Sequence, residues 1–181
     1  PTGRFTPDLG RGARHVLLAA GSGITPVLSM ASSLLRRTDS RVTLVYGNRR
    51  SDTVMFADEL ADLKDAFGPR LELIHVLSRE PRESELFTGR LDGAKVDRLL
   101  STVVAADGVD HWWLCGPHGM VTEARQVLAE HGVAGERVHQ ELFFVEGAEP
   151  PPRVRHEEPE VEGPASEVVV VLDGRTTTLR L

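Results

Sequence analysis

The chain has 181 residues, of which 40% are apolar, and carries a formal net charge of −6 at pH 7. This length allows one domain of ordinary size plus some remainder, and the negative charge argues against a nucleic acid or an anionic membrane as the main partner. The single cysteine, Cys115, excludes an internal disulfide, and no Cys and His residues share metal-ligand spacing. No apolar run approaches the roughly 18 residues that cross a bilayer, so we expect a cytoplasmic protein without a metal site or a membrane span.

The first predicted element is a strand at residues 15–20, HVLLAA. Its nearly continuous apolar run is typical of a central strand in a parallel sheet that is covered on both faces. A Gly-Ser-Gly turn at residues 21–23 ends the strand, and we expect Thr25 to cap, and Pro26 to begin, a helix that extends to about residue 37. Residues 1–13, before the strand, show no helical periodicity and are expected to form a loop.

A strand, a glycine turn and a helix N-terminus in this order form an anion site, because unpaired backbone N–H groups and the positive end of the helix dipole face the ligand. We interpret this stretch as a pyrophosphate site. The dinucleotide fingerprint G-x-G-x-x-G is not met, because Pro26 occupies the position of the third glycine. A tight connection without a ligand is therefore the alternative.

Strands and helices continue to alternate along the chain. Further strands are predicted at residues 41–47, 71–77, 111–115 and 137–143. Helices are predicted over residues 94–100, with Asp92 as the cap, and over 119–130. A further helix is predicted from apolar residues that recur at helical spacing and should form its buried stripe: Phe56, Leu60, Leu63 and Phe67. Five strands that alternate with helices over about 130 residues specify an α/β fold, a doubly wound five-stranded parallel sheet.

The composition changes after this domain, which we place at residues 14–146. Residues 147–166 are rich in proline and glutamate, as expected for an extended linker. Residues 167–181 contain two strand-like runs around Asp173-Gly174, a strong signal for a β-hairpin. A lone hairpin is marginally stable in water, so we expect it to be an incomplete piece of a further domain.

Ligands on doubly wound sheets bind beyond the carboxyl ends of the strands. The residues there form the candidate site: Gly21, Ser22, Gly23, Ile24, Thr25, Asn48, Arg49, Arg50, Ser78, Arg79, Cys115, Gly116, Pro117 and Glu141. Arginine after the second strand, with no acidic residue at the end of that strand, favours a ribose 2′-phosphate over ribose hydroxyls. Other interpretations are open for some of these residues. The arginines are compatible with ordinary solvated surface, Cys115 with a buried strand position, and Glu141 with the exposed face of a strand.

Two motifs about 90 residues apart, GSGITP at 21–26 and CGPHGM at 115–120, resemble the ferredoxin–NADP reductase superfamily. In that family the first motif holds the pyrophosphate of the nicotinamide dinucleotide and the second lies beside the nicotinamide. The resemblance therefore adds Pro26 and Met120 to the cofactor-binding residues. It implies catalytic positions for Cys115 and Glu141 beside the nicotinamide, and it matches Ser78-Arg79 to the family's pair at the 2′-phosphate.

The order of segments resembles the phenylacetyl-CoA epoxidase type of reductase within that superfamily. Residues 1–13 look like the tail of a flavin-binding barrel, and residues 167–181 look like the first hairpin of a plant-type 2Fe-2S domain. The resemblance implies electron flow from NADPH through FAD and a 2Fe-2S centre to an oxygenase or ferredoxin-type acceptor. The FAD and 2Fe-2S sites would lie outside this chain, so we expect this polypeptide alone to be inactive.

Three alternatives accompany this interpretation. The chain is compatible with a noncatalytic nucleotide-binding or electron-partner docking module, and with an NADH-dependent oxygenase reductase of the same superfamily. A different doubly wound enzyme, such as a methyltransferase, is disfavoured by the two paired motifs.

Overall fold

The computed structural model describes residues 5–142, 167–172 and 175–180. The chain divides into two compact units, Pro1–Glu146 and Gly147–Leu181, each of which is described by itself. The predicted linker at 147–166, the first four residues and the Asp173-Gly174 turn lie outside the described residues.

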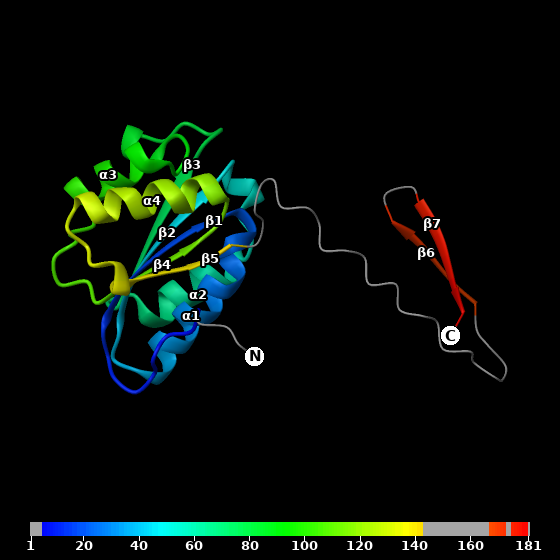
Figure 1. Cartoon of the computed structure of the whole chain (residues 1–181), viewed down its shortest axis with the longest axis horizontal. Helices are drawn as coiled ribbons and strands as arrows, with labels where there is room; N and C mark the ends of the chain where they lie inside the picture. Colours follow the sequence, from blue (N-terminus) through cyan, green and yellow to red (C-terminus); the bar gives the residue numbers. More distant parts are fainter. Residues whose placement is uncertain (1–4, 143–166, 173–174, 181) are drawn as a thin grey trace. The chain divides into compact units, whose positions relative to one another are not determined.

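The first unit contains a five-stranded parallel sheet in the order β3-β2-β1-β4-β5. Its strands are β1 (Arg14–Ala20), β2 (Arg41–Asn48), β3 (Leu71–Leu77), β4 (His111–Cys115) and β5 (Val138–Glu141). Its helices are α1 (Ile24–Arg37), α2 (Ala57–Phe67), α3 (Gly93–Thr102) and α4 (His118–Glu130). The pair α1 and α2 covers one face of the sheet and the pair α3 and α4 covers the other, as Figure 1 shows. The predicted doubly wound α/β fold is confirmed.

Burial on both faces explains the unbroken apolar run of β1. Val16 and Leu18 pack toward α3 and α4, whereas Leu17 and Ala19 pack toward α1 and α2. All four side chains are buried. A central strand of this kind has no solvent face on which polar residues would alternate.

The start of α1 differs from the prediction. Residues Gly21–Gly23 form a 3-10 turn, η1, and α1 begins directly at Ile24. Thr25 is the second helical residue, and its hydroxyl donates to the carbonyl of Ser22 at 3.0 Å instead of accepting from a free N–H group. The predicted cap at Thr25 is therefore wrong. Pro26 is tolerated at the third helical position because the N–H there still has no partner within the helix.

The stripe predicted for the second helix is correct at Leu60 and Leu63, which are buried, and wrong at Phe56. Phe56 precedes α2 in a left-handed conformation with φ 59°, and its side chain is 37% exposed. Its carbonyl accepts from Leu60 N at 2.9 Å and so begins the helix. The sharp entry turn, which the helical period cannot reveal, removes Phe56 from the stripe.

The strands β3 and β4 have the predicted bounds, and the remaining boundaries shift by at most two residues. Asp92 caps α3 as predicted, since its Oδ1 accepts from Lys95 N at 2.9 Å. The strand β5 begins at Val138, because Gly135–Arg137 forms a 3-10 turn, and its last described strand residue is Glu141. Residue 143, the predicted end of this strand, lies outside the described residues.

The second unit contains the predicted hairpin. Strands β6 (Glu167–Leu172) and β7 (Arg175–Arg180) pair antiparallel, with Leu172 opposite Arg175. Two residues therefore separate the strands, which is the loop length expected for an Asp-Gly hairpin.

Candidate nucleotide-binding site

The two sequence motifs meet at the carboxyl ends of β1 and β4, which are neighbours in the sheet. The strand order reverses at this point. The strands β2 and β3 lie on one side of β1, whereas β4 and β5 lie on its other side. Ligands of doubly wound sheets bind at such a switch point. The fold therefore brings the two motifs together at the switch point of the sheet.

The glycine turn needs both of its glycines, for different reasons. Gly21 has φ 54°, a conformation that L residues with a side chain rarely adopt, and space is open where its Cβ would lie. Gly23 packs against the end of β4, where an added Cβ would lie 2.6 Å from the carbonyl carbon of Cys115 and 2.9 Å from Gly116 N. The turn is thus held against β4 on one side and open on the other.

Tyr46 supports the same turn from β2. Its side chain is fully buried, and its hydroxyl donates to the carbonyl of Gly21 at 3.2 Å. Burial raises the pKa of Tyr46, so the hydroxyl keeps its proton for this bond. Tyr46 was not among the predicted site residues, although it stands two positions before Asn48 on a correctly predicted strand; only the tertiary contact with Gly21 reveals its role.

The loops after β2 and β3 run side by side beyond the sheet. Ser78 N donates to Asn48 O at 2.9 Å, and Arg79 N donates to Arg49 O at 2.8 Å. These bonds continue the parallel register of the two strands by one step past their ends. The structure therefore brings together the residues predicted for the 2′-phosphate, and the side chains of Arg49, Arg50 and Arg79 are exposed.

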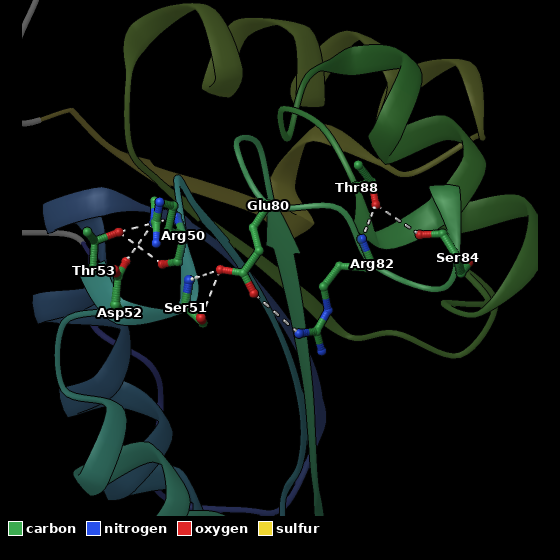
Figure 2. Close-up of polar contacts among 8 residues, drawn as sticks. All are labelled: Arg50, Ser51, Asp52, Thr53, Glu80, Arg82, Ser84 and Thr88. Carbon is green, nitrogen blue, oxygen red and sulfur yellow. Dashed lines mark hydrogen bonds and ion pairs between the residues drawn. The ribbon is translucent and has the colours of Figure 1, made fainter.

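Two carboxylates enter this region. Asp52 Oδ1 accepts from Arg50 Nε at 3.1 Å, and Glu80 Oε2 accepts from both the amide nitrogen and the hydroxyl of Ser51 at 2.8 Å each (Figure 2). No acidic residue stands at the end of β2 itself, which is Asn48 followed by Arg49 and Arg50, but two carboxylates lie close by in the loops. Asp52 and Glu80 follow the predicted arginines by only a few positions, and the pairing of β2 with β3 brings them to the same edge.

The two residues assigned to the nicotinamide end are also neighbours. Cys115 is opposite Glu141 in the register of β4 and β5. The Cys115 thiol is fully buried, and burial, followed by the nearby charge of Glu141, raises its pKa to about 11. The thiol is therefore protonated at neutral pH and lies in the core beneath the surface of the site.

Two other predicted residues contribute little side-chain surface to a ligand. The Ile24 side chain is fully buried in the core beneath α1, and Met120 is 8% exposed and packs against Gly116. Pro117, the third residue of the second motif, is exposed. Ile24 and Met120 therefore support the shape of the two turns from below.

A separate shallow groove of about 410 Å³ lies between α1 and α2, and of the predicted site residues only Thr25 lines it. It is a different feature from the strand-end site, because its other lining residues come from the two helices and from Phe56. Among the described residues, no group of three His, Cys, Asp or Glu side chains is arranged to hold a metal ion. In the same part of the chain, no helix combines the length and apolar character needed to span a membrane.

The fold and the strand-end site together define a nucleotide-binding α/β domain. The chain belongs to the oxidoreductase NAD-binding domain family, which matches residues 17–126. The superfamily resemblance stated from the two motifs is confirmed by this match.

Comparisons with known proteins agree with the family assignment. The chain is 37% identical to a component of 1,2-phenylacetyl-CoA epoxidase from Escherichia coli, over 97% of this chain and 49% of that protein. It is 35% identical to the ferredoxin reductase component of 3-ketosteroid-9-alpha-monooxygenase from Mycobacterium tuberculosis, over 99% of this chain and 46% of that protein. The chain thus spans about half the length of these curated relatives. A crystal structure of an Amycolatopsis cytochrome P450 reductase matches with a TM-score of 0.62 and 28% identity, over 73% of this chain and 38% of that one.

Proposed function

We propose that this chain is the NADPH-binding part of a flavin-dependent reductase that delivers electrons to an oxygenase or ferredoxin-type acceptor. The observation that carries the proposal is the meeting of the glycine turn, the Cys115-Gly116 turn and the arginine-bearing loops along one edge of the sheet. This edge combines open backbone at Gly21 with exposed cations at Arg49 and Arg79. Both features suit the phosphate groups of a dinucleotide.

Each part of the nucleotide has a matching set of residues in this proposal. The pyrophosphate is assigned to the turn and helix start at Gly21, Ser22, Gly23, Ile24, Thr25 and Pro26. The 2′-phosphate is assigned to Asn48, Arg49, Arg50, Ser78 and Arg79, and the nicotinamide to Cys115, Gly116, Pro117, Met120 and Glu141. The bound nucleotide supplies the hydride. The residues of this chain bind and orient the nucleotide, and the small side chain of Cys115 permits close approach of the reacting rings.

The rest of the proposed electron path lies in other parts of a longer protein. We assign residues 1–13 to the end of a flavin-binding barrel, 14–146 to the nucleotide domain, 147–166 to a linker and 167–181 to the start of a 2Fe-2S domain. The support comes from relatives named as an epoxidase component and as the ferredoxin reductase component of a monooxygenase, of which this chain covers about half. FAD and the 2Fe-2S centre then belong to the flanking domains. This polypeptide alone should therefore show neither the flavin nor the iron–sulfur absorption band, and no diaphorase activity.

A second candidate is a preference for NADH. The observation that favours it is the Glu80 carboxylate, which follows β3 but contacts Ser51 in the loop after β2. In folds of this type, a carboxylate at the end of the second strand accepts hydrogen bonds from ribose hydroxyls.

Calorimetric titration of the 181-residue chain with NADPH and with NADH tests the proposal. We expect tighter binding of NADPH, and a loss of about tenfold or more in NADPH affinity for Arg79→Ala, as for the loss of one charge-assisted contact. Arg11→Ala is the control, since Arg11 is exposed in the loop before β1 at the opposite edge of the sheet. Equal affinities for the two nucleotides, unchanged by Arg79→Ala, would refute the 2′-phosphate assignment.

A further inference from the structure

Ser51 donates two hydrogen bonds to the Glu80 carboxylate next to the residues assigned to the 2′-phosphate. The amide N–H and the hydroxyl of Ser51 both donate to one oxygen, Glu80 Oε2, at 2.8 Å each. Figure 2 shows the Glu80 carboxylate reaching across from the loop after β3 to the loop after β2. Two donors that converge on one oxygen are the arrangement that also binds a phosphate oxygen.

Two arginines lie near this carboxylate. Arg82 Nη1 lies 3.8 Å from Glu80 Oε1, and Arg50, which pairs with Asp52 within its own loop, directly precedes Ser51. The Ser51 hydrogen bonds, followed by the charges of Arg82 and Arg50, lower the pKa of Glu80. Glu80 is therefore an anion at neutral pH, and it occupies the donors that an incoming anion would use.

The location of this contact links it to the nucleotide. Glu80 directly follows the Ser78-Arg79 pair, and Ser51 directly follows Arg49-Arg50. The backbone bonds from Ser78 and Arg79 to Asn48 and Arg49 hold the two loops in register. The Glu80 carboxylate consequently stands among the groups assigned to the 2′-phosphate, with its side chain 29% exposed.

We propose that Glu80 is the residue that sets the balance between NADPH and NADH in this site. This inference rests on the proposed nucleotide function. A 2′-phosphate must take over the Ser51 donors from Glu80 or lie beside its negative charge. A nucleotide that ends in a free 2′-hydroxyl leaves the Ser51–Glu80 contact intact and can donate its hydroxyl to the carboxylate.

Replacing the carboxylate by an amide separates charge from shape. In Glu80→Gln the side-chain oxygen still accepts from Ser51, whereas the negative charge that opposes a 2′-phosphate is gone. We expect the affinity for adenosine 2′,5′-bisphosphate to rise about fivefold or more, as for the loss of one like charge near a protein surface. The affinity for adenosine 5′-monophosphate should stay the same or fall.

Isothermal titration of the 181-residue chain with these two probes is the experiment, with thermal unfolding recorded to show that the variant is folded. Glu83→Gln is the matched control, because Glu83 is an exposed carboxylate in the same loop. This control should change the affinity for neither probe by more than about twofold, since single exposed charges act weakly.

The possible results are distinct. A rise in the ratio of bisphosphate to monophosphate affinity in Glu80→Gln, absent from Glu83→Gln, supports the inference. An unchanged ratio, or an equal loss for both probes, would show that Glu80 is only a tether between the two loops and would overturn it. If the unaltered chain binds neither probe, the nucleotide function itself is refuted and the inference falls with it.

Discussion

Gly23 lies directly against the backbone of Cys115, so closely that the two sequence motifs share one contact surface at the end of the sheet. A Cβ on Gly23 would overlap the main chain of Cys115 and Gly116, which cannot move without disturbing β4. The absence of a side chain at this glycine is therefore required by packing within the protein, in addition to any approach of a phosphate.

Gly23→Ala should destabilise the fold and loosen the site together. We expect a loss of about 1–3 kcal/mol in the free energy of unfolding, as for overpacking in a tight interior. Urea denaturation followed by far-ultraviolet circular dichroism measures it. Gly119→Ala is the control, because Gly119 is helical in α4 and nothing lies within 4 Å of an added Cβ there. A variant at Gly23 as stable as the unaltered chain would contradict the packing argument.

Tyr46→Phe removes one hydroxyl and leaves the buried ring in place. The hydroxyl donates to the Gly21 carbonyl at 3.2 Å, so its loss should cost about 1 kcal/mol of stability. The glycine turn then loses its anchor to β2, and we expect NADPH affinity to fall by about two- to fivefold. Urea denaturation and calorimetry measure the two effects. Unchanged stability and affinity would mean that the bond neither supports the fold nor orders the turn.

A cluster of aromatic rings at the start of β1 and β4 predicts a pH dependence of stability. His15 is 1% exposed, and its Nδ1 accepts from Trp113 Nε1 at 3.2 Å. Burial, followed by the nearby His111, lowers the pKa of His15 to about 4; Asp110 opposes this shift and His139 adds to it. His15 is therefore neutral in the native protein across most of the acid range.

The sign of this pH dependence follows from proton binding. Between pH 6.5, the ordinary pKa of histidine, and pH about 4, the unfolded chain binds a proton at His15 that the native chain does not. Stability is therefore fully present above pH 6.5 and declines as the pH falls toward 4, by ~3 kcal/mol from this residue. Urea denaturation at a series of pH values measures the slope. His15→Gln should flatten it, whereas His118→Gln, at an exposed position, should not. An equal slope in both variants would place the effect elsewhere.

Local patterns in the sequence determined the fold class and the strand ends. The two-faced burial of β1 requires a continuous apolar run, and the capping of α3 by Asp92 needs only a few consecutive residues. The pairing of β6 with β7 was likewise predictable from a few consecutive residues, the Asp-Gly pair between two strand-like runs. The carboxyl ends of parallel strands share one edge, so the candidate residues could also be gathered from the order of the elements alone.

The tertiary structure decided which side chains meet at that edge. The bond from Tyr46 to Gly21 and the contact between Ser51 and Glu80 join residues that lie 25 and 29 positions apart. Such contacts depend on the register of β2 against its neighbours and on the course of the loops beyond them, which carry no periodic signal. The left-handed backbone at Phe56 likewise belongs to the turn by which the chain enters α2, and this turn, which has no helical period, leaves the Phe56 side chain exposed.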